Sequence, residues 1–197
     1  RQHLRCPVES LRLLDIDPDT VSDVVLTHLH YDHVGNFHKF AKAHFHLQTR
    51  EMGFVTGPYM RYPKFGHSFE VDDVVGMVKL NFKGRVEQHR EDFQLADGIS
   101  LHHVGGHTPG LQIVRVMTKR GWVVLASDAA HYFEHMRTNR FFVTAFNLGD
   151  MIDGYRTCER LAASPDHIVP GHDPLVMKLY PAASPKLDGV IVDRKST

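Results

Sequence analysis

Three histidines and one aspartate lie within six residues of the chain, as His28, His30, Asp32 and His33. They follow an apolar, β-branched run at 24–26, which is typical of a buried strand. Side chains two apart on extended backbone point the same way, so His28 and His30 can bind one cation. Asp32 and His33 lie past the strand end, where the turning chain can direct them at a second cation. Neutral imidazole and carboxylate suit zinc, manganese, iron or cobalt.

The alternative is a solvated histidine-rich loop, because the chain has 16 histidines among its 197 residues. A short motif of this kind carries a real risk of a chance match. Its position after a hydrophobic run and before Gly35 favours the metal interpretation.

Three further predicted strands end in a loop with a ligand-type residue, and these residues are His107, Asp128 and His172. A single such residue is usually solvated, but the repetition predicts ligands gathered at one edge of a sheet. Nearby glycines let backbone approach a metal without a Cβ in the way. Seven ligands are too many for one tetrahedral zinc and suit two metals with an open position for water.

The elements that must position these residues are predicted from hydrophobic periodicity and turn signals. Strands are expected at 24–26, 44–47, 85–89, 99–104, 111–117, 122–126 and 167–169. Helices are expected at 11–14, 50–56, 70–82 and 148–162. His44 and His46 share a strand face, for which an exposed surface is expected rather than a second metal pair. The aromatic loop at 57–66 is either a lid or substrate wall, or a segment packed on the core.

Composition excludes several classes of protein. Lysine plus arginine and aspartate plus glutamate each number 23, so the net charge is zero and a nucleic-acid partner has no electrostatic support. Cys6 and Cys158 form no disulfide framework, and Cys158 is expected to be a buried apolar residue. The chain shows no membrane-spanning run and no signal-peptide pattern, which predicts a cytoplasmic protein with no membrane partner. The sequence leaves a homodimer open.

The ordered motifs resemble those of the metallo-β-lactamase superfamily from about Val21 to Tyr180. They are His-x-His-x-Asp-His at 28–33, Gly-His-Thr-Pro-Gly at 106–110, Ser-Asp at 127–128 and Pro-Gly-His at 170–172. The resemblance implies an α+β fold, a four-layer αββα sandwich, with a dinuclear site along the edge of the two sheets. We expect a single domain over 1–197.

The resemblance also assigns the metal ligands by matching position. The first metal would be bound by His28, His30 and His107. The second would be bound by Asp32, His33 and His172, and Asp128 would bridge the two. The implied cofactors are two divalent ions, zinc foremost, with manganese, iron or cobalt as alternatives.

Within the superfamily the chain is most similar to the N-acyl-homoserine lactonase group, through 27–33, 126–130 and 170–173. Two features depart from that group. Its members place a catalytic tyrosine three residues after the bridging aspartate, where this chain has His131 followed by Tyr132. Superfamily members also carry an Asp-Thr-Gly-like turn before the first histidine motif, and residues 1–27 contain none. We therefore expect either a fragment or an incomplete first sheet.

The implied reaction is hydrolysis of a small acyl lactone, such as an N-acyl homoserine lactone, or of a related ester. Water that bridges two cations gives hydroxide at neutral pH, which would attack the carbonyl carbon. Asp128 would pass a proton to the leaving oxygen, and His131 or Tyr132 would donate to the oxyanion. The catalytic candidates are Asp32, Asp128, His131 and Tyr132.

Other functions on the same scaffold stay open, namely a thioesterase of the glyoxalase II type and a β-lactamase. A superfamily nuclease is disfavoured by the zero net charge. A non-catalytic metal-binding module is a further alternative, against which the complete set of seven ligands argues. Four apolar residues expected near the site are assigned mainly to core packing: Phe37, Phe65, Met136 and Phe146.

Overall fold

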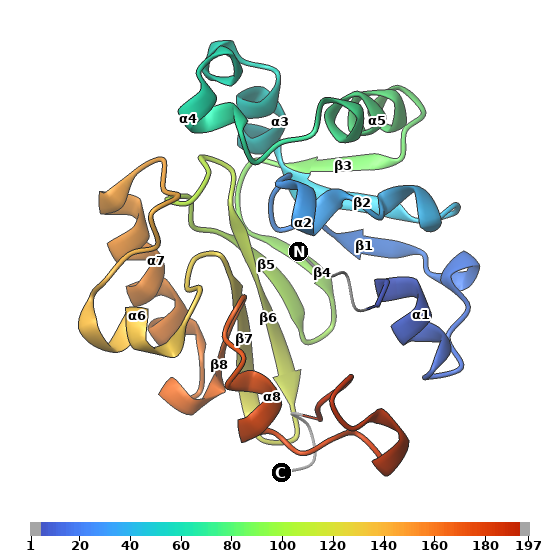
Figure 1. The fold of residues 1–197 in the computed structure, drawn as a ribbon, viewed down its shortest axis with the longest axis vertical. Helices are drawn as coiled ribbons and strands as arrows, with labels where there is room; N and C mark the ends of the chain where they lie inside the picture. The colour runs from blue at the N-terminus through green and yellow to red at the C-terminus, as the bar shows by residue number, and fades with distance from the viewer. Residues whose placement is uncertain (1–4, 194–197) are drawn as a thin grey trace.

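The structure, a computed structural model, describes residues 5–193, which form two β-sheets with helices on their outer sides (Figure 1). The first sheet has the strand order β1-β2-β3 and is parallel throughout. The second has the order β4-β5-β6-β7-β8, antiparallel except for the β7–β8 pair. This arrangement is the expected αββα sandwich, and the α+β prediction is confirmed.

The element bounds agree closely with the periodicity for most of the chain. The strands are β1 (Asp23–Val25), β2 (His44–Gln48), β3 (Val86–His89), β4 (Phe93–Ala96), β5 (Ile99–His103), β6 (Gln112–Thr118), β7 (Gly121–Ser127) and β8 (Ile168–Pro170). The α-helices are α1 (Pro7–Arg12), α2 (Tyr31–Val34), α3 (Thr49–Val55), α4 (Pro63–Gly66), α5 (Val71–Phe82), α6 (Phe133–Thr138), α7 (Leu148–Leu161) and α8 (Val176–Leu179). Short 3₁₀ turns lie at Pro18–Thr20, Phe37–Lys39, Pro58–Arg61, Pro165–His167 and Pro185–Leu187. No helix within residues 5–193 has the length and apolar character needed to cross a membrane.

Each sheet buries its outer apolar face under its own helices. In the first sheet, Phe45 of β2 packs in one cluster with Phe54 of α3 and Met77 of α5. In the second sheet, Val124 of β7 packs in a separate cluster with Cys158 of α7. Cys158 is fully buried, as expected for a small apolar residue.

Polar side chains connect the two sheets on their facing sides. Gln48 Nε2 at the end of β2 donates to Gln112 Oε1 on β6 at 3.0 Å. Gln112 Nε2 in turn donates to the backbone carbonyls of Leu26 and His46, at 2.9 and 3.0 Å. These buried amides form hydrogen bonds from one sheet to the other, so they fix the position of the strand ends of the first sheet relative to those of the second.

Strand β4 and four short helices, α2, α4, α6 and α8, escaped the sequence prediction, and one helix was misplaced. Strand β4 is mostly exposed and lacks clear alternation. The four helices have only four to six residues each, which is too short to show a helical period. The first helix begins at Pro7 rather than at residue 11, because Pro7 takes the first helical position and Glu9 caps the backbone of Cys6.

The strand face of His44 and His46 also differs from the expectation. His44 is exposed, but His46 is buried, because β2 is the central strand of its sheet. The His46 ring contacts Asp23 Oδ1 at 2.9 Å and His89 Nε2 at 3.1 Å. Each His46 nitrogen therefore faces a protein group, as in a satisfied buried polar side chain.

Candidate metal centre

The candidate ligands lie where strand ends of both sheets meet. The loop after β1 carries His28 and His30, and α2 then carries Asp32 and His33. The other three come from the second sheet: His107 between β5 and β6, Asp128 after β7 and His172 after β8. A hydroxyl contact of 2.8 Å between Thr27 and Ser127 joins the ends of β1 and β7 directly. Residues a hundred positions apart in the chain are thereby brought together.

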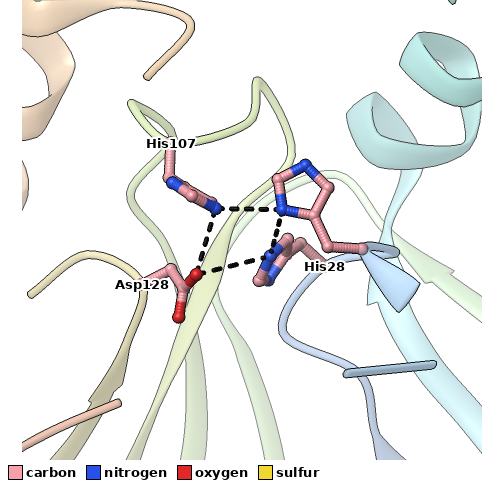
Figure 2. Close-up of side chains that lie close together, drawn as sticks. His28, His107 and Asp128 are labelled. Atoms are coloured by element: carbon pink, nitrogen blue, oxygen red, sulfur yellow. Dashed lines mark hydrogen bonds and ion pairs between the residues drawn. The ribbon is translucent and has the colours of Figure 1, made fainter. Parts of the chain in front are cut away.

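Three buried imidazoles and one carboxylate oxygen form a compact first group. His30 Nδ1 lies 3.0 Å from both His28 Nε2 and His107 Nε2. Asp128 Oδ2 lies 3.0 Å from His107 Nε2 and 3.8 Å from His28 Nε2. Figure 2 shows His28, His107 and Asp128 converging on a common point. Ligand atoms around a tetrahedral zinc are about 3.3 Å apart for bonds of ~2.0–2.1 Å, so the group has suitable dimensions.

A second, more exposed group lies on the other side of Asp128. Asp32 Oδ2 lies 3.8 Å from the Nε2 atoms of both His33 and His172. Asp128 Oδ1 lies 3.4 Å from His33 Nε2 and 2.9 Å from His172 Nε2. One oxygen of Asp128 therefore faces each group, which is the geometry of a bridging carboxylate.

Several nitrogen and oxygen atoms of the two groups face one another closely, an arrangement that a bound cation would stabilise. His107 Nδ1 donates to the backbone carbonyl of Thr144 at 2.7 Å, so the neutral ring has its lone pair on Nε2. That lone pair faces a carboxylate oxygen of Asp128 and a ring nitrogen of His30. In addition, within the described residues the buried His33 Nε2 makes no hydrogen bond, and Asp128 Oδ1 has only the ring contacts with His33 and His172. A divalent cation in each group would satisfy these atoms.

The electrostatics keep His28, His30 and Asp128 in their metal-binding forms, whereas the contact with Asp128 raises the pKa of His172. Burial lowers the pKa of His30 to about 3 and that of His28 well below its usual range, so both rings are neutral at pH 7. Burial alone would raise the pKa of Asp128, but the rings around it, His107 first, hold that pKa well below its usual range. Neutral imidazoles and an ionised carboxylate are the states that bind metal.

A close backbone approach holds Asp128 in place. Ser127 has a positive φ of 46°, which turns the chain sharply at the end of β7. A Cβ on Gly171 would lie 2.8 Å from the Ser127 carbonyl and 3.0 Å from Asp128 Oδ1. Glycine is therefore required at 171 for the loops of Asp128 and His172 to come together.

A cavity of about 560 Å³ opens above the two groups. Its walls include six of the residues discussed here: His30, Asp32, His107, Asp128, His131 and His172. The volume is within the range of small-molecule sites, which makes this the principal candidate for substrate binding.

The structure separates the two candidate oxyanion donors. His131 is 3% exposed, its Nε2 lies 3.2 Å from Asp128 Oδ2, and its ring stacks on Phe142 with the centroids 4.0 Å apart. Burial lowers the pKa of His131. Tyr132 is half-buried and also lines the cavity, just before α6. His131 is thus held against the Asp128 carboxylate, and both His131 and Tyr132 line the cavity.

Of the four apolar residues expected near the site, two lie beside it and two lie elsewhere. Phe65 and Phe146 belong to an aromatic cluster with Phe54 and Tyr59, with ring centroids 5.2–6.4 Å apart, beside His30 and His107. Phe37 instead packs against Gly76 of α5, and Met136 lines a different cavity near α8. Tyr59 and Phe65 of the loop at 57–66 therefore pack beside the site, whereas Tyr62 of the same loop is exposed.

Sequence reasoning missed Glu51, Phe142 and the carbonyl of Thr144. Glu51 is a fully buried acid within α3, and a charged residue among apolar helix positions was the available signal. Every residue has a backbone carbonyl, so the sequence does not show that the carbonyl of Thr144 accepts a hydrogen bond from a candidate ligand.

Comparisons with known proteins agree with this geometry. The family model described as Metallo-beta-lactamase superfamily matches residues 2–176. The N-acyl homoserine lactonase AiiB of Rhizobium rhizogenes is 37% identical over 132 residues, which is 62% of this chain and 45% of AiiB. The chain thus spans about half the length of this curated relative.

Two solved structures share the fold. An N-acyl homoserine lactone hydrolase, with the product N-hexanoyl-L-homoserine at its catalytic metal centre, superposes with a TM-score of 0.71 at 20% identity, covering 87% of this chain and 64% of that one. AidC, a dizinc quorum-quenching lactonase, gives a TM-score of 0.67 at 16% identity, covering 88% of this chain and 65% of AidC. Together with the ligand geometry and the family match, these results show that the chain belongs to the metallo-β-lactamase superfamily.

Proposed function

We propose that this chain holds a dinuclear metal centre and hydrolyses N-acyl homoserine lactones. The observation that carries the proposal is the position of Asp128, whose two oxygens face two separate groups of ligand atoms beneath an open cavity. The proposed first group is His28, His30 and His107, and the proposed second group is Asp32, His33 and His172. The lactonase names of the relatives support the choice of substrate.

Two zinc ions are the proposed cofactors, since the ligands are imidazoles and carboxylates and AidC is a dizinc enzyme. When bound, the cations would polarise the ester carbonyl and lower the pKa of a water molecule. The fit rests on the facing lone pairs and the unpartnered buried atoms of the site.

The side chains of this protein supply the remaining functions. Asp128 lies at the base of the cavity and is proposed to accept a proton there and return it to the leaving oxygen. Asp32 reaches the same cavity from the second group. Tyr132 borders the open space and is proposed to donate its hydroxyl to the developing oxyanion. His131 is proposed to orient Asp128, because its Nε2 faces the carboxylate.

The test is a panel of substrates offered to the zinc-loaded protein and to the chelator-treated protein. An N-acyl homoserine lactone, the glyoxalase II thioester substrate and a β-lactam are compared at equal concentration. We expect the lactone to be opened fastest and chelator to abolish the activity. A thioester or β-lactam turned over faster than the lactone would contradict the substrate assignment. The cytoplasmic location and the single domain stay predictions, and a homodimer stays open.

A further inference from the structure

Glu51 lies behind the metal ligands rather than among them. It projects from α3, is fully buried and contacts both of the loops that supply the three histidines of the first group. Its Oε1 accepts a hydrogen bond from the backbone N–H of Leu29 at 3.0 Å. Its Oε2 accepts from the Thr108 hydroxyl at 2.6 Å and from the Gly110 N–H at 3.2 Å.

The positions of these donors connect Glu51 to three ligands. Leu29 stands between His28 and His30, and Thr108 directly follows His107. One carboxylate therefore joins the loop of the first sheet to the loop of the second, immediately behind the converging nitrogens.

The burial of this acid needs a reason, because an ionisable group without exposed surface is costly unless it is hydrogen-bonded. Three donors satisfy both oxygens of Glu51. The approach is also very close, since a Cβ on Gly110 would collide with the backbone of Glu51. The chain thus places a glycine where the second loop must contact α3.

We propose that Glu51 is a positioning residue of the metal centre, which holds the two ligand loops at the separation that the first cation requires. This inference rests on the proposed dinuclear centre. Outer partners of this kind orient ligands, and losing one typically weakens metal affinity about 10–100-fold. Part of the free energy needed to bring the Nε2 atoms of His28 and His107 to 3.0 Å from His30 Nδ1 is thereby supplied by the fold.

Replacing Glu51 with glutamine tests the idea with little change in volume. The amide oxygen of E51Q can still accept from Thr108 and Gly110. Its NH₂ group would then face the N–H of Leu29, donor against donor, in place of the present hydrogen bond. The segment of His28 and His30 would lose its connection to α3.

The experiment is a titration of the metal-free protein with cobalt(II) under native conditions, followed by visible absorption. Gln48→Leu is the matched control, since Gln48 is equally buried, precedes Glu51 by three residues and bonds Gln112 rather than a ligand loop. Denaturant unfolding of the same samples reports stability separately. We expect both variants to lower the free energy of unfolding. E51Q alone should weaken binding of the first cobalt by about 10–100-fold.

The possible results distinguish a failure of the positioning role of Glu51 from a failure of the proposed metal centre. Wild-type affinity in E51Q, or an equal loss in Q48L, would overturn the positioning role and leave the metal centre intact. A wild-type protein that binds no cobalt would overturn the metal centre and this inference together. If E51Q does not fold, T108V removes only one donor, and an unchanged cobalt affinity in T108V would equally overturn the role.

Discussion

Asp128 is the residue on which the chemistry of the site converges. Its carboxylate is buried and faces imidazoles on both sides, with His172 Nε2 at 2.9 Å and His107 Nε2 at 3.0 Å. These contacts hold its pKa low despite burial, so the group is an anion, as its proposed bridging role requires. His131 approaches the same oxygen as His107 and stacks on Phe142, so its ring has little freedom to follow a substrate.

Tyr132→Phe tests the remaining donor at the residue scale. If the hydroxyl stabilises the oxyanion, its removal should lower kcat by about 10²–10³-fold and leave KM and metal content nearly unchanged. Tyr62→Phe is the control, since Tyr62 is an exposed tyrosine outside the cavity walls. Unchanged kcat in Y132F, together with a large loss in His131→Gln, would transfer the role to His131.

The seven candidate ligands could be found from the sequence, because metal ligands are restricted to few residue types and here follow predicted strands. Glu51 could not be placed in the same way. Its importance depends on three donors from two distant loops, which no local pattern records. The sequence likewise could not show whether His131 or Tyr132 is the oxyanion donor, because the answer depends on where these two adjacent side chains point.

At the scale of elements, α7 covers the second sheet and fixes the back of the site. Tyr155 and Cys158 on its buried face pack with Val124 of β7. Burial raises the pKa of both groups to about 12, and the Tyr155 hydroxyl donates to the Arg140 carbonyl at 2.7 Å. The packing of α7 therefore depends on a neutral thiol and a neutral phenol.

This dependence predicts a loss of stability in alkali. Cys158 has a higher pKa folded than unfolded, so the folded state binds more protons between about pH 9 and 12. Its stabilising contribution is complete below pH 9 and is lost as the pH rises, at about 1.4 kcal/mol per pH unit. Urea unfolding from pH 8 to 10.5 measures the slope. Cys158→Ala should flatten it, and equal slopes in both proteins would contradict the account.

Most elements could be predicted because their apolar residues recur with a clear period. The helix expected at 70–82 is α5, and the hairpin expected at 111–126 is β6 and β7. Within α5 the pattern was less informative, since Met77 is its buried residue while Val71 and Phe82 at its ends are exposed. Tertiary packing, rather than periodicity, decides which apolar residues of a helix are covered.

At the scale of the whole molecule, the site lies between the two sheets. The first sheet supplies four candidate ligands and the second supplies three, so neither can form the centre alone. The order of the strands in each sheet could not be deduced from the sequence, because pairing between distant strands leaves no local signal. The resemblance to a known family implied the αββα layers and the site at the edge of the sheets, but it gave no strand order.

A centre shared between the sheets would bind the folded chain and not the unfolded one. Metal should therefore raise the midpoint of thermal unfolding, and chelator should lower it. The control is Asp32→Asn, which weakens only the second group and should reduce the shift without abolishing it. Identical midpoints with and without metal in the wild type would exclude a cation that links the sheets.

The most direct test of the dinuclear centre is elemental analysis of the zinc-loaded protein after removal of free metal. We predict about two equivalents of zinc per chain in the wild type and about one in Asp32→Asn. Fewer than one equivalent in the wild type would contradict the metal centre. A single equivalent in both proteins would contradict the bridging role of Asp128.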